Sequence, residues 1–118
     1  MGKAKSTIES QKQMLKRAKE FIIELKRIIN IEDIYVVGSR ARGDYLDVSD
    51  IDLVIISDDF KNMSYINRIE LLSKYLRPRI EFFAYTREEW ENHSSPYVKE
   101  MKKEAKRLDE LLKLYNVE

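Results

Sequence analysis

Several residue types that build common functional sites are absent or scarce in this sequence. It contains no cysteine, which excludes a disulfide framework, a thiolate zinc site and a cysteine nucleophile. One histidine is too few for a histidine-rich metal centre. The three glycines and two prolines are spread along a chain that has no linker, internal repeat or low-complexity tract.

Long apolar runs are missing as well. The longest is a few residues, whereas a helix that crosses a bilayer needs roughly 18 or more. The N-terminal region carries lysines and lacks the apolar stretch of a signal peptide. We therefore expect a cytoplasmic protein that has no membrane partner.

The remaining composition is that of one small and strongly ionic domain. At 118 residues the chain is expected to form a single domain over 1–118. Charged residues reach 36%, against a usual share of about 25%. The 22 Lys and Arg nearly cancel the 21 Asp and Glu, so the net charge does not point to nucleic acid as a stable partner. The composition also resembles that of heat-adapted proteins, which makes a thermophilic source a hypothesis.

Apolar residues at spacings of three and four predict amphipathic helices over 6–29 and 96–115. A further helix must end before Pro78, because proline disfavours helical geometry in the residue before it. The apolar stripe of this helix comprises Ile66, Ile69, Leu72 and Leu76, and helix starts are marked by Ser6 with Glu9, Thr86 with Glu89, and Ser95 with Pro96.

Runs of β-branched and aromatic residues at 34–37, 51–56 and 80–85 predict three strands. Together with the helices, they predict a small α/β or α+β domain. We expect a mixed sheet of three or more strands flanked by helices. In the last of these strands, Glu81 lies on the face opposite to Ile80.

The acidic residues are concentrated in one stretch. Residues 44–59 contain six aspartates and no lysine or arginine. Asp50 and Asp52 alternate at the start of a strand, so both side chains project from one face and favour a divalent cation. If the strand containing Glu81 lies alongside, the three carboxylates could hold two Mg²⁺ or Mn²⁺ ions. Alternatively, Glu81 faces water or pairs with Arg77 or Arg79.

The turn after the first strand has the features of an anion site. Free amides at Gly38 and Ser39, together with the Ser39 hydroxyl, could cradle phosphate oxygens. Arg40 and Arg42 could add positive charge there. The alternative for both arginines is a surface salt bridge with the aspartates within residues 44–47.

Gly38-Ser39, ten intervening residues and Asp50-x-Asp52 reproduce the signature G-S-x(10)-D-x-D. This pattern resembles the minimal nucleotidyltransferases of the DNA polymerase β superfamily, including their antitoxin type. The resemblance covers roughly residues 30–90, which would form the catalytic core of a polymerase β-like nucleotidyltransferase fold. It extends through residues 38–43 and 49–53 and through Ala84-Tyr85-Thr86.

The resemblance implies a role for each residue of the signature. Asp50 and Asp52 would bind two Mg²⁺ ions, and Glu81 would support one of them. Gly38 and Ser39 would hold a nucleoside triphosphate, with ATP as the expected donor of AMP to a hydroxyl group. Many relatives have aspartate where this chain has Glu81.

The resemblance also bears on partners. Larger relatives carry an additional domain that grips the base or the acceptor. Stand-alone relatives commonly accompany a HEPN-type helical protein and act as its antitoxin, and some adenylylate a tyrosine of that partner. Two alternatives are a non-catalytic partner-binding module with a vestigial nucleotide site and a small-molecule nucleotidyltransferase. Whether the chain forms a homodimer is left open.

Overall fold

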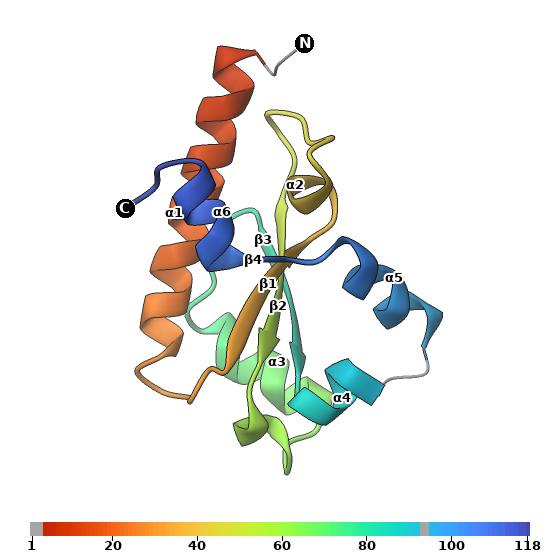
Figure 1. The fold of residues 1–118 in the computed structure, drawn as a ribbon. Helices are drawn as coiled ribbons and strands as arrows, with labels where there is room; N and C mark the ends of the chain where they lie inside the picture. The colour runs from red at the N-terminus through yellow and green to blue at the C-terminus, as the bar shows by residue number, and fades with distance from the viewer. Residues whose placement is uncertain (1–3, 93–94) are drawn as a thin grey trace.

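The fold was analysed in a computed structural model, described for residues 4–92 and 95–118. Its centre is a four-stranded mixed sheet with the order β3-β2-β1-β4 (Figure 1). β1 pairs antiparallel with β2 and β4, whereas β2 pairs parallel with β3. The mixed sheet predicted from the sequence is confirmed. The strands are β1 (Asp33–Val37), β2 (Ile51–Ile56), β3 (Ile80–Tyr85) and β4 (Lys106–Arg107).

Helices cover both faces of this sheet. The long helix α1 contacts α6, and both contribute to the larger apolar cluster, whereas α4 and α5 contribute to the smaller one. No helix within the described part of the chain is long and apolar enough to span a membrane. The helices are α1 (Lys5–Leu25), α2 (Ser39–Arg42), α3 (Tyr65–Ser73), α4 (Arg87–Asn92), α5 (Pro96–Glu104) and α6 (Leu108–Leu114), with a 3₁₀ turn η1 (Asp58–Phe60).

Strand β2 shows why the sheet is buried on both sides. Leu53 and Ile55 belong to the cluster under α1 and α6, whereas Val54 and Ile56 belong to the cluster under α4 and α5. Side chains alternate between the two faces of a strand, so a strand buried on both faces reads as a continuous apolar run. The same alternation places Asp52 on the α4–α5 face, at the start of the run.

Two of the predicted helix starts are confirmed and one is wrong. In the Thr86–Glu89 capping box, each backbone N–H donates to the partner's side chain, at 2.8 and 3.1 Å. Ser95 accepts the N–H of Tyr97, with Pro96 at the first helical position. At the N-terminus, however, α1 begins at Lys5 after Ala4 without a side-chain cap, so Ser6 already lies inside the first turn. Helix α1 also ends at Leu25, before the predicted residue 29.

The single C-terminal helix predicted over 96–115 is wrong, because the chain extends at Ala105 (φ −60°, ψ 134°). The next two residues form β4 along the outer edge of β1. Val98 of α5 packs in the cluster on one face of the sheet, and Leu108 of α6 packs in the other. The apolar residues of 96–115 therefore pack on both faces of the sheet. Their regular spacing in the sequence gives no sign of the break at Ala105.

Helix α3 buries Leu72 of the predicted apolar stripe but not its two isoleucines. Ile66 is 68% exposed and Ile69 is 39% exposed, so these two residues do not belong to the core. The buried residues of α3 are Leu72 and Arg68. The Arg68 guanidinium donates to Glu89 at 2.6 Å and to the Ala84 carbonyl at 3.1 Å, which secures α3 to β3 and α4.

Candidate active site

The strand register brings the predicted carboxylates together. Asp52 is paired with Glu81 across the parallel β2–β3 ladder and with Val37 across the antiparallel β1–β2 ladder. The turn that begins at Gly38 is therefore next to Asp52. Glu81 is exposed, although its neighbours in the strand are apolar. Among the described residues, its charged contact is Asp52, because Arg77 bonds Glu24 and Arg79 lies beside Asp50.

Gly38 allows the backbone to approach the Asp52 carboxylate closely. Its φ of 74° lies in the region that favours glycine, and a Cβ at this position would lie 2.5 Å from Asp52 Oδ2. Its carbonyl accepts the N–H groups of Ala41 and Arg42, which starts the short helix α2. The sequence Gly38-Ser39 thus places a tight turn against a carboxylate.

The electrostatics at Asp52 favour a bound cation. Burial, a hydrogen bond with Glu81 and the charges of Glu81, Asp50 and Glu104 raise the pKa of Asp52 to about 7. Clustered carboxylates of this kind retain a proton unless a cation neutralises them. Every donor is a hard oxygen, which suits Mg²⁺ or Mn²⁺.

Asp50 is directed toward a cation of the chain itself. Its Oδ1 lies 3.6 Å from Nε of Arg79, which also donates to the carbonyls of Asp47 and Ser49. In this conformation, no three Asp, Glu or His side chains in residues 4–92 and 95–118 are grouped closely enough to hold a metal. Asp50 must turn from Arg79 to join Asp52 and Glu81 around an ion.

Arg40 is not placed to contact a phosphate, contrary to the first of its two expected roles. It is 1% exposed, and its guanidinium donates to the Ser49 carbonyl at 2.7 and 3.1 Å and to Ser10 Oγ at 2.9 Å. It also lies 4.7 Å from the centre of the Tyr45 ring. Arg40 therefore anchors the acidic loop to α1.

Arg42 adopts the second role expected for it, a salt bridge at 3.2 Å with Asp44. Its Nη1 also donates to Oε2 of Glu104 at 2.8 Å, and Oε1 of that glutamate accepts the Gly38 N–H at 2.8 Å. Sequence reasoning missed Glu104. It lies 66 residues from Gly38, at the end of a lysine- and glutamate-rich helix, and no local motif marks it.

The sequence matches the nucleotidyltransferase domain family over residues 15–112. The chain belongs to this family. Among solved structures, a presumed nucleotidyltransferase from Sulfolobus solfataricus is 36% identical and superposes with a TM-score of 0.77. The alignment covers 91% of this chain and 89% of that one. Comparison with curated proteins gave no match.

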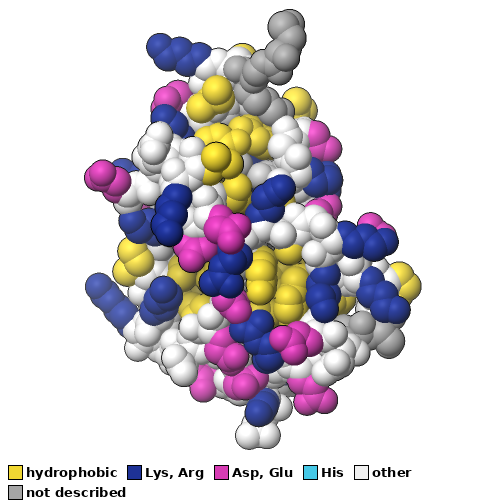
Figure 2. Space-filling model, viewed as in Figure 1, with side chains coloured by type: hydrophobic (Ala, Val, Ile, Leu, Met, Phe, Trp, Pro, Cys, Tyr) yellow, Lys and Arg dark blue, Asp and Glu magenta, His cyan; other side chains and the backbone are white. Residues whose placement is uncertain are grey.

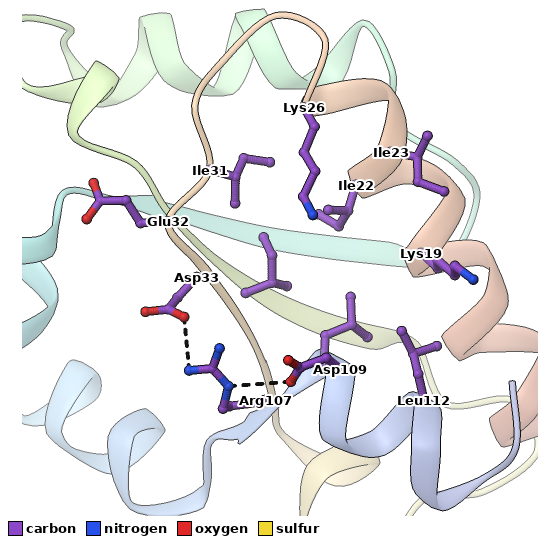
Figure 3. A pocket seen from close by; sticks show the side chains of 12 residues that line it. Lys19, Ile22, Ile23, Lys26, Ile31, Glu32, Asp33, Arg107, Asp109 and Leu112 are labelled. Carbon is purple, nitrogen blue, oxygen red and sulfur yellow. Dashed lines mark hydrogen bonds and ion pairs between the residues drawn. The ribbon is translucent and has the colours of Figure 1, made fainter. Parts of the chain in front are cut away.

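A cavity of this nucleotidyltransferase domain lies away from Asp50, Asp52 and Glu81. It measures about 250 Å³ and is bounded by α1, β1 and α6 (Figure 3). At its rim, Arg107 bridges Asp33 at 3.0 Å and Asp109 at 3.4 Å. None of the predicted site residues lines this cavity. Asp50 and Glu81 are exposed and Asp52 is partly buried, so the carboxylate site is open to solvent at one end of the sheet.

Proposed function

We propose that this domain is a metal-dependent nucleotidyltransferase that transfers AMP from ATP to a hydroxyl group. The observation that carries the proposal is the contact of the Gly38 turn with Asp52, which itself pairs with Glu81. This contact joins a backbone anion site to a carboxylate pair, as transfer from a triphosphate requires.

The residues of the signature and Glu81 would have separate roles. Asp50, Asp52 and Glu81 would hold two Mg²⁺ ions or Mn²⁺. When bound, such ions neutralise the phosphate charge and stabilise the attacking and leaving oxygens. The Gly38 amide and the Ser39 hydroxyl would hold the triphosphate. The acceptor oxygen bonds to the α-phosphorus, the bond to the bridging oxygen breaks, pyrophosphate leaves and the acceptor proton passes to solvent. Positioning and charge neutralisation supply most of the catalysis.

The acceptor in this proposal is a HEPN-type helical protein, for which the domain acts as the antitoxin. Two observations support an acceptor on a second molecule. The carboxylate site is open surface, and the loop before Asp50 presents Leu46 and Val48, which are 67% and 76% exposed. A protein that covers this loop would bring its hydroxyl to the site.

Labelling of the acceptor tests the proposal. The domain is incubated with Mg²⁺, α-³²P-labelled ATP and a purified HEPN-type protein. We expect label on the partner with the wild type and with Asp47→Asn, an exposed aspartate of the same acidic stretch, but not with Asp52→Asn. Equal labelling by wild type and Asp52→Asn would remove the assigned site.

Two observations favour a second function, that of a non-catalytic partner-binding module. The Gly38 N–H is already bonded to Glu104, and Asp50 lies beside Arg79, as in a nucleotide site that no longer binds substrate. Neutralisation of the partner by a variant carrying both Asp50→Ala and Asp52→Ala would support this function over the first.

A further inference from the structure

A carboxylate of the chain itself occupies the anion site of the Gly38 turn. Glu104 is the last residue of α5, and its side chain is 24% exposed. One carboxylate oxygen accepts the Gly38 N–H and the other accepts Nη1 of Arg42, both at 2.8 Å. A backbone amide and a guanidinium are the donors that bind phosphate oxygens in proteins. Glu104 thus makes the contacts that a phosphate group would make.

The charge of Glu104 is unfavourable for its surroundings. It adds to the negative field that raises the pKa of Asp52, together with Glu81 and Asp50. A carboxylate stays beside like charges only where specific donors hold it. Here those donors are Gly38 and Arg42, which hold the Glu104 carboxylate beside the acidic cluster.

The same donor cannot serve both anions. One backbone N–H makes one strong hydrogen bond, so a phosphate oxygen that takes the Gly38 amide must remove the Glu104 carboxylate from it. Arg42 can remain, because its guanidinium has five donors and its other partner, Asp44, is exposed. The release breaks the two hydrogen bonds of Glu104, whose partly exposed side chain lies at the end of α5.

We propose that Glu104 is an internal competitor of the nucleotide and sets its affinity. The carboxylate fills the phosphate position of the Gly38 turn in the free domain. The triphosphate displaces it and gains both Gly38 and Arg42 as ligands. This inference rests on the proposed function only in identifying the displacing anion as the triphosphate of a nucleotide.

Calorimetric titration with Mg²⁺ and ATP tests the competition. We expect Glu104→Gln and Glu104→Ala to bind ATP about 5-fold or more tightly than the wild type, because no charged side chain has to be displaced. Glu100→Gln is the matched control. Glu100 lies one turn earlier on α5 and pairs with Lys103 on the surface. The Glu100→Gln variant should therefore bind ATP with the affinity of the wild type.

A second titration separates this inference from the proposed function. Inorganic tripolyphosphate without metal probes the anion site alone, and both Glu104 variants should bind it more tightly than the wild type, whether or not the domain transfers AMP. Unchanged or weaker binding of both probes by Glu104→Gln and Glu104→Ala would overturn the proposal. The proposal would also be overturned if the Glu104 variants bound ATP more weakly than the wild type only when Mg²⁺ is present. Glu104 would then be one of the metal ligands.

Discussion

At the scale of single residues, Gly38 determines how closely the turn after β1 approaches the Asp52 carboxylate. Its positive φ and the position of Asp52 Oδ2 both exclude a side chain. Gly43, at the other end of α2, also has a positive φ, of 95°, but nothing lies within 4 Å of a Cβ built there. The two glycines therefore separate backbone strain from steric contact with the site.

We expect Gly38→Ala to lower the free energy of unfolding by about 2–4 kcal/mol and to abolish ATP binding, since the new methyl group displaces Asp52. Gly43→Ala should cost only about 1 kcal/mol, from the backbone conformation alone, and should leave ATP binding intact. Urea unfolding and calorimetry measure the two effects. Equal losses of ATP binding in both variants would show that ATP binding does not depend on the Gly38–Asp52 contact.

The residues of the site were predictable from sequence to different extents. Gly38, Ser39, Asp50 and Asp52 are close in sequence and form a local signature, and Glu81 followed from the alternation of its strand. The roles of the arginines did not follow, because exposure depends on which carbonyls the tertiary fold brings within reach. Glu104 had no signal at all, since its contacts join segments that are distant in the chain.

At the scale of elements, the strands were easier to predict than the ends of the helices. β2 and β3 were predicted with their observed bounds, because both are short runs rich in β-branched and aromatic residues. The prediction of one helix over 96–115 was wrong because the apolar spacing continues past the break at Ala105. The residues before the break pack on one face of the sheet and those after it pack on the other. In α3, the apolar pattern predicted that isoleucines pack against the rest of the fold. The buried Arg68 makes that contact instead.

Helix α3 therefore offers a test at this scale. We expect Arg68→Ala to lower the free energy of unfolding by about 2–4 kcal/mol, because it removes the hydrogen bonds of a buried guanidinium to Glu89 and the Ala84 carbonyl. Ile66→Ala should change it by no more than about 0.5 kcal/mol, since that side chain is exposed. Urea denaturation compares the two variants. If Ile66→Ala lowered the free energy of unfolding more than Arg68→Ala does, the result would support the packing predicted from the sequence instead.

At the scale of the whole molecule, the near-zero net charge conceals a local organisation. Figure 2 shows basic and acidic side chains interspersed over the viewed face, with apolar side chains between them. The formal net charge is +1, yet residues 44–59 carry six aspartates. Long-range attraction of a triphosphate is therefore weak. In the proposed function, binding of the triphosphate would depend on metal ions and on a few local donors at the Gly38 turn.

The central claim is that Asp52 and the Gly38 turn form the nucleotide site of this domain. The most direct test is to titrate three proteins with a non-hydrolysable ATP analogue in the presence of Mg²⁺ and to measure binding by calorimetry. The proteins are the wild type, Asp52→Asn and the exposed control Asp47→Asn. We expect the wild type and Asp47→Asn to bind with equal affinity, and Asp52→Asn to bind about 10-fold or more weakly. Equal affinity in all three proteins would contradict the assignment of the site.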